Sequence, residues 1–215
     1  MRYRHIFFDL DGTLTDSKPG ILNAFAHALE VMGLKADPQA LEQFIGPPLR
    51  DTFRGYFGLD DDAVERAVTA YRQYYREKGM FENAPYPGVP EMLATLAEAG
   101  AELVLATSKA AFFADAIMKH FGLVRYFSFL GASDPGKGRS SKADVLEYAL
   151  ENSAARDLKD CVLVGDTRYD VEGARIVGME CVGAGYGYGG EERLREAGAS
   201  RIAPTVADLE KLLLS

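Results

Sequence analysis

Residues 4–17, RHIFFDLDGTLTDS, decide the fold of this chain. The bulky run 5–8 is typical of a strand buried on both faces, as in the centre of a parallel sheet. Because side chains alternate along a strand, Asp9 and Asp11 are expected to project to the same side, and Gly12 marks a turn. An acidic turn without chemistry is the simpler alternative. The wholly apolar strand and the spacing of two favour paired carboxylates at the sheet edge where α/β proteins bind ligands.

Composition sets limits on the class of protein. The chain has 215 residues, of which 47% are hydrophobic and 26% charged, enough for one globular domain with or without an insertion. A formal charge of −8 argues against a nucleic acid polymer as partner. No apolar run reaches membrane-spanning length and no signal-peptide pattern is present, so we expect a cytoplasmic protein that does not bind membranes. Cys161 and Cys181 lie in apolar runs and are expected to be buried free thiols.

After residue 17 the pattern becomes helical for about 70 residues. Helices are expected over 19–32, over 38–44, up to residue 57 after a rigid loop at 45–48, and after the acidic triplet 60–62. The first should bury Ile21, Leu22, Phe25, Leu29 and Met32, and the last Val64, Ala67, Val68, Tyr71 and Tyr75. No strand is expected within 18–84. The sequence therefore predicts a helical insertion after the first strand.

From residue 86 onward, predicted strands and helices alternate. The strands are expected at 103–106, 126–130, 161–164, 179–183 and 201–203. The helices are expected at 90–99, 112–121, 142–151 (capped by Ser141 and Asp144), 168–177, 191–197 and 206–214. Repeated βα units predict an α/β fold with a doubly wound parallel sheet.

Polar side chains follow several of these strands. They are Asp9, Asp11, Thr107, Lys142, Asp166 and Asp170. Four carboxylates at one sheet edge repel each other unless a cation lies among them, and all-oxygen ligands favour Mg²⁺ over zinc. A lysine and a hydroxyl add donors for phosphate oxygens. This combination predicts phosphoryl transfer.

The motifs DLDGT (9–13), TSK (107–109), Lys142 and GDTRYD (165–170) together resemble the haloacid dehalogenase-like superfamily of hydrolases. The resemblance covers the whole chain, and the helical insertion resembles the C1-type cap of its subfamily I. It implies a Rossmann-like core formed by residues 1–15 and 86–215, with a helical cap formed by residues 16–85.

The resemblance also implies roles for single residues. Asp9 would be the nucleophile that forms an aspartyl-phosphate, and Asp11 the general acid that protonates the leaving oxygen and then activates water. Thr107 and Lys142 would bind the phosphoryl group. Mg²⁺ would be held by Asp9, the backbone carbonyl of Asp11 and Asp166, with Asp170 supporting. Substrate-binding positions would be Gly12, Thr13, Ser108, Lys109 and Arg50.

The cap is expected to select the substrate. Its loop at 46–50, GPPLR, is similar to that of phosphoglycolate phosphatases and of 5′-nucleotidase-like members, and the stretch 78–83 is closer to the latter. Arg50 is a candidate contact for the leaving group, with a solvated surface arginine as the alternative. The run GYGYGG at 185–190 is not a dinucleotide fingerprint and is interpreted as a flexible loop near the rim of the site.

These observations give one leading hypothesis and several alternatives. The leading one is a Mg²⁺-dependent hydrolase of a small-molecule phosphate ester, monomeric or homodimeric. A sugar phosphomutase of the same fold and a catalytically idle binding or regulatory protein are the alternatives. A dehalogenase is disfavoured because Asp11 is present, and a phosphonatase would need a Schiff-base lysine in the cap, for which Lys18 and Lys35 are candidates by type only.

Overall fold

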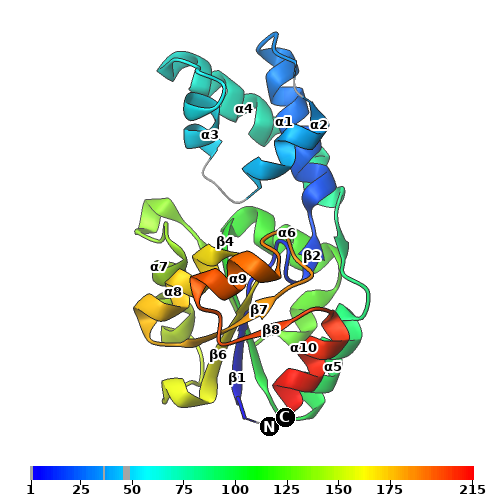
Figure 1. Cartoon of the computed structure of the whole chain (residues 1–215), viewed down its shortest axis with the longest axis vertical. Coiled ribbons are helices and arrows are strands. Elements are labelled where there is room, and N and C mark those ends of the chain that lie inside the picture. Colours follow the sequence, from blue (N-terminus) through cyan, green and yellow to red (C-terminus); the bar gives the residue numbers. More distant parts are fainter. Residues whose placement is uncertain (1, 36, 46–48) are drawn as a thin grey trace. The chain divides into compact units, whose positions relative to one another are not determined.

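The computed structural model describes residues 2–35, 37–45 and 49–215, which form two compact units (Figure 1). The core unit consists of the chain up to Asp16 together with Pro85–Ser215. The helical unit is Ser17–Ala84.

The core unit is built on one six-stranded sheet with the order β5-β4-β1-β6-β7-β8. Its strands are β1 (His5–Phe8), β4 (Glu102–Ala110), β5 (Phe129–Ser133), β6 (Cys161–Gly165), β7 (Glu180–Ala184) and β8 (Arg201–Ala203). Every neighbouring pair is parallel. The predicted α/β fold with a doubly wound parallel sheet is therefore confirmed, with β1 in its interior between β4 and β6.

Helices cover both faces of the sheet (Figure 1). One face carries α7 (Lys142–Glu151), α8 (Arg168–Val177) and α9 (Glu191–Ala197), and the other carries α5 (Val89–Glu98), α6 (Ala111–His120) and α10 (Val206–Leu214). Short 3-10 turns complete the unit: η3 (Leu123–Tyr126), η4 (Pro135–Lys137) and η5 (Leu158–Asp160). This is the double winding that right-handed crossovers produce.

The core explains why the first strand is so apolar. Phe7 is fully buried in a cluster with Val104, Leu146 and Leu163, while Ile6 is fully buried as well. Each such side chain contributes about 1.5–3 kcal/mol by leaving water. β1 is thus held on both faces up to Asp9, which fixes the place at which the chain turns.

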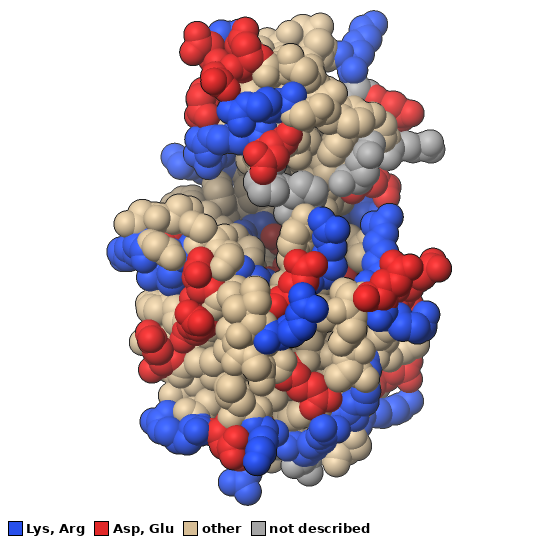
Figure 2. All heavy atoms as spheres, turned by 60° about the vertical axis from the view of Figure 1, so that its left-hand side comes forward, with Lys and Arg blue, Asp and Glu red and all other residues tan. Residues whose placement is uncertain are grey.

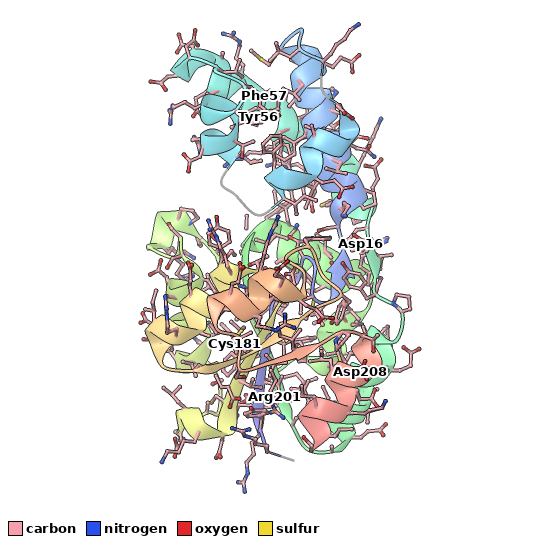
Figure 3. All side chains as sticks on the ribbon, in the orientation of Figure 1. Asp16, Tyr56, Phe57, Cys181, Arg201 and Asp208 are labelled. Atoms are coloured by element: carbon pink, nitrogen blue, oxygen red, sulfur yellow. The ribbon has the colours of Figure 1, made fainter. Side chains whose placement is uncertain are left out.

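The helical unit contains α1 (Lys18–Val31), α2 (Pro38–Leu41), η1 (Glu42–Phe44), α3 (Leu49–Gly55), α4 (Asp61–Glu77) and η2 (Gly79–Phe81). Asp60 caps α4 by accepting from the Ala63 N–H, and all five residues of the predicted α4 stripe are buried. The unit's aromatic core includes Phe57, labelled with the half-exposed Tyr56 in Figure 3. Residues 46–48 of the predicted rigid loop lie outside the described residues.

The predicted buried face of α1 is partly wrong. The helix buries Phe25 and Leu29 as expected, but with Ala24 and Ala28 rather than with Ile21 and its neighbour Leu22, which are half-buried. α1 packs against α4 and η2, and the small side chains let the backbones approach. A prediction based on the large apolar residues alone therefore placed one edge of the buried face of α1 wrongly.

Two strand predictions need correction. The strand expected at 126–130 lies at Phe129–Ser133, because residues up to Tyr126 form η3. Glycine at 131, inside this strand, is what the close packing requires, because a Cβ there would lie 2.8 Å from the Leu105 carbonyl oxygen. The expected absence of strands in 18–84 is wrong at its last residue, since β3 (Ala84–Pro85) pairs with β2 (Thr15–Asp16). A strand of two residues is too short for an alternation of apolar and polar side chains to be recognised in the sequence.

The surface carries both signs of charge. Figure 2 shows Lys and Arg side chains interspersed with Asp and Glu over the face it displays. Among the described residues, no helix has both the length and the apolar character needed to cross a membrane.

Both cysteines are free and buried, as expected, and Cys181 is labelled on β7 in Figure 3. Burial, together with the nearby carboxylate of Asp160, raises the pKa of the Cys161 thiol to about 11. Burial also raises the pKa of Cys181.

Since the thiolate is the reactive form, neither cysteine should react with a disulfide reagent in the native protein. We expect no labelling without denaturant and two thiols in denaturant, counted by absorbance; rapid labelling of native protein would contradict the core packing described above.

Candidate active site

The site lies where three adjacent strands end. Asp9 follows β1, Thr107 lies near the end of β4 and Asp166 follows β6. β1 is the strand from which the sheet is extended in both directions, and such a switch point opens a crevice at the carboxyl edge. All three side chains are buried.

Lys142 lies at the centre of this group. It is the first residue of α7, where Ser141 and Asp144 form a complete capping box that fixes the start of the helix. Its ammonium Nζ lies 2.8 Å from Asp9 Oδ1 and 2.7 Å from Asp170 Oδ1, and donates to the Ala106 carbonyl oxygen at 2.9 Å. Its three donor hydrogens therefore have three acceptors.

The charges of these groups depend on each other. Burial alone would lower the pKa of Lys142, but Asp170 and Asp9 raise it above its usual value. Burial raises the pKa of Asp9 to about 6 against the opposing effects of Lys142 and of a hydrogen bond from Thr107. At neutral pH, Asp9 is therefore mostly an ionised carboxylate beside a charged lysine.

The other two carboxylates are held by the segment after β6. Asp170 Oδ2 accepts hydrogen bonds from the Thr167 hydroxyl at 2.7 Å and from the Thr167 N–H at 3.0 Å. Asp166 is fully buried, and its burial, together with Asp170 and Asp9, raises its pKa well above the usual range. Among the described residues, no ammonium contacts Asp166 in the way that Lys142 contacts Asp9 and Asp170.

This group fits a divalent cation. Ligand oxygens of Asp9, Asp166 and Asp170 all lie within 4.8 Å of one another, and all three residues are buried. Three carboxylates face one ammonium, so two formal negative charges remain uncompensated. Burial, and after it the neighbouring carboxylates of Asp170 and Asp9, raise the pKa of Asp166. Hard oxygen ligands of this kind suit Mg²⁺.

Asp11 departs from the predicted cluster of four carboxylates. Its side chain is not among the three grouped residues; its Oδ2 lies 2.6 Å from Lys109 Nζ instead. Lys109 was expected to face the substrate, and its side chain is nearly buried in this ion pair. β1 ends at Phe8, so the alternation that would align Asp9 with Asp11 does not extend through the turn. The two acids are thereby placed in separate surroundings.

The remaining predicted site residues lie in different places. Gly12 and Thr13 are buried in the turn after β1, and the Thr13 hydroxyl donates to Asp166 Oδ1 at 3.4 Å. Ser108 is exposed on β4. Arg50 belongs to the helical unit, where it forms a bidentate ion pair with Glu65 at 2.6 and 2.9 Å. Its contact with a substrate stays a prediction.

The loop GYGYGG was underestimated from the sequence. It was interpreted as flexible and peripheral, but the Tyr188 N–H donates to Asp166 Oδ2 at 2.7 Å. The Tyr186 hydroxyl donates to the Thr13 carbonyl oxygen at 2.9 Å, which ties the loop to the turn after β1. A backbone N–H donor cannot be recognised from the type of residue that carries it. The alternation of Gly and Tyr directly after a strand is nevertheless a signal from which a role for this loop in the site could have been predicted.

A doubly wound sheet with a buried carboxylate and lysine cluster at its switch point is the arrangement that phosphoryl transfer requires. The family model for haloacid dehalogenase-like hydrolases matches residues 6–184, and the chain belongs to this family.

Known proteins resemble the chain over nearly its whole length. A 5′-nucleotidase of Pseudomonas aeruginosa is 37% identical over 216 residues, covering 100% of this chain and 97% of that protein. The tyrosine-protein kinase PtkA of Mycobacterium tuberculosis is 38% identical over 212 residues, covering 97% of this chain and 72% of its own. The crystal structure of a predicted phosphatase from Clostridium acetobutylicum superposes with a TM-score of 0.91 at 38% identity, covering 100% of this chain and 99% of that one. The chain is a phosphatase of this family.

Replacing Lys142 should destabilise the core unit. In Lys142→Met, two buried carboxylates lose their ammonium, which costs about 3–5 kcal/mol of unfolding free energy. Lys211→Met is the matched control, because Lys211 is exposed and pairs only loosely with Asp208 at 3.7 Å. The control should change stability by less than about 0.5 kcal/mol. Denaturant titration measures both, and equal effects would show that Lys142 is not a central charge of the site.

Proposed function

We propose that the chain is a Mg²⁺-dependent phosphomonoester hydrolase that acts on a small phosphorylated metabolite, of the phosphoglycolate or 5′-nucleotide type, through an aspartyl-phosphate on Asp9. The observation that carries the proposal is the buried group of Asp9, Asp166 and Asp170 around Lys142, with its two uncompensated negative charges. A phosphate dianion would be repelled from this edge without a cation. Mg²⁺, held by the three carboxylates, would supply charge neutralisation for the transferring group.

Asp9 and Asp11 have different roles in the two steps of the proposed reaction. In the first step a carboxylate oxygen of Asp9 bonds to phosphorus while the bond to the leaving oxygen breaks, and Asp11, which has to be protonated at this stage, gives its proton to that oxygen and becomes the carboxylate that pairs with Lys109. In the second step water attacks phosphorus, Asp11 takes the proton, and the bond to Asp9 breaks. Lys142 holds Asp9 in place and Thr107 supports it, so the nucleophile does not have to be ordered during the reaction.

The ion pair of Asp11 with Lys109 fits this division. It neutralises the charge of Asp11 and keeps its carboxylate apart from the three that group around Lys142. A proton-transferring acid in the place of Asp9 or Asp170 would be restrained by the Lys142 ammonium and could not serve the leaving group independently. The separation supports distinct roles for the two acids of DLDGT.

The helical unit is the proposed cap, formed by residues 16–85, that selects the leaving group. The relative named 5′-nucleotidase favours the 5′-nucleotide type of substrate among the two considered. A phosphomutase would share the first step and return the phosphoryl group to a sugar phosphate instead of water.

Removal of the nucleophile or of the metal should stop turnover. Asp9→Asn is expected to lower kcat by at least about 10³-fold, since an amide cannot form the acyl phosphate. Excess chelator should abolish phosphate release, and added Mg²⁺ should restore it. Beryllium fluoride should protect the wild type, but not the variant, against unfolding. Full activity in chelator would contradict the metal, and an active Asp9→Asn variant would contradict the nucleophile.

A substrate panel separates the remaining alternatives. We expect steady release of phosphate from an aryl phosphate without a bisphosphate activator, and the highest kcat/KM for a 5′-nucleotide or phosphoglycolate rather than for hexose phosphates. Phosphate release is followed colorimetrically, with Asp9→Asn as the blank. A requirement for a sugar bisphosphate would identify a mutase, and no turnover of any ester would favour an idle binding protein.

A further inference from the structure

The loop 185–190 brings a backbone donor to a carboxylate that has few other partners. Asp166 is fully buried beyond β6, and its Oδ2 accepts from the Tyr188 N–H at 2.7 Å. The second oxygen, Oδ1, accepts a longer hydrogen bond of 3.4 Å from the Thr13 hydroxyl. A hydrogen bond to a buried carboxylate is among the stronger kinds, and it fixes the direction in which the other oxygen points.

Glycines make this approach possible. A Cβ on Gly187 would lie 2.3 Å from Asp166 Cβ and 2.3 Å from the Gly12 carbonyl oxygen. A Cβ on Gly189 would lie 2.1 Å from the Asp166 carbonyl oxygen. The loop therefore packs backbone against backbone around Asp166, and any side chain at these two positions would move it away. Gly136, in η4 of the same unit, is not among the glycines with a positive φ, and a Cβ there would meet only Asp134 Oδ1 at an ordinary 3.5 Å.

Tyrosine hydroxyls tie the loop to the other half of the site. The Tyr188 hydroxyl donates to Asp16 Oδ1 at 3.1 Å, and Asp16 is labelled at the end of β2 in Figure 3. The Tyr186 hydroxyl donates to the Thr13 carbonyl oxygen at 2.9 Å, and the Tyr186 ring packs edge-on against Tyr86 at 5.1 Å. The loop thus joins the segment after β1, which begins with Asp9, to the end of β6.

Taken together, the contacts point to a function for a motif that the proposed reaction leaves unused. We infer that loop 185–190 is a positioning element of the metal centre, in which the Tyr188 N–H orients the Asp166 carboxylate and Gly187 provides the space for it to do so. The inference rests on the proposed function, because it takes Asp166 as a metal ligand. Partners of this type around a ligand typically change metal affinity by about 10- to 100-fold when they are lost.

Direct metal binding tests the inference without turnover. Mn²⁺, which like Mg²⁺ accepts oxygen ligands, is titrated into metal-free protein without substrate, and free Mn²⁺ is read from its electron paramagnetic resonance signal. Gly187→Ala should weaken binding about 10- to 100-fold. Gly136→Ala, the same change outside the loop, should bind within about twofold of wild type, because its side chain meets only an ordinary van der Waals contact and its φ is not in the left-handed region. Circular dichroism of the metal-free variants checks that each is folded.

A second variant keeps the test decisive if Gly187→Ala fails to fold. Tyr188→Phe retains the ring and the backbone N–H but releases the loop from Asp16, so it should weaken Mn²⁺ binding several-fold without loss of the fold. Wild-type affinity in a folded Gly187→Ala, or, where that variant does not fold, in Tyr188→Phe, would overturn the inference. So would an equal loss in Gly136→Ala. No Mn²⁺ binding by the wild type, or binding unaffected by Asp166→Asn, would instead contradict the proposed metal site itself.

Discussion

The buried ammonium of Lys142 is the interaction on which the site depends. It enters a region that would otherwise hold only carboxylates, and it contacts Asp9 and Asp170 at 2.8 and 2.7 Å. A charge that has lost its water is tolerated only when its partners are fixed, since the desolvation cost is several kcal/mol per ion. The capping box of α7 and the parallel strands supply that fixation. The start of α7 and the parallel strands therefore hold Lys142 and the carboxylates at fixed positions. The single ammonium does not balance the three carboxylates, and a cation would supply the missing positive charge.

Much of this arrangement could be predicted from the sequence because its signals are local. The apolar run before Asp9 predicted an interior strand, and alternating strand and helix patterns predicted the doubly wound sheet that β1 to β8 form. Ser141 and Asp144 predicted the exact first residue of α7, and so the position of Lys142. Each of these signals depends on the residue's own type and on neighbours within one turn or one strand.

What could not be predicted depends on contacts between distant segments. The pairing of Lys109 with Asp11 spans 98 positions, and alternation along a strand had placed Asp11 with Asp9 instead. The Tyr188 N–H on Asp166 is a backbone donor, which any residue but proline could offer. Gly131 lies within β5, where close packing against Leu105 requires a glycine. In each case the residue type is compatible with several roles, and only tertiary structure selects among them.

The glycines around Asp166 and the ammonium beside Asp9 hold two carboxylates of the site in different ways. In the proposed reaction Asp9 has to be ionised to attack phosphorus, and the buried ammonium of Lys142 at 2.8 Å favours that ionised form. Asp166 has only to keep one orientation, and a rigid backbone N–H achieves that without adding a charge that would compete with the metal for its oxygens. A second lysine at Asp166 would remove part of the negative excess that favours a divalent ion. A neutral donor at Asp166, and a charged one at Asp9 and Asp170, thus support the proposal that the site holds a dication and a phosphate ester together.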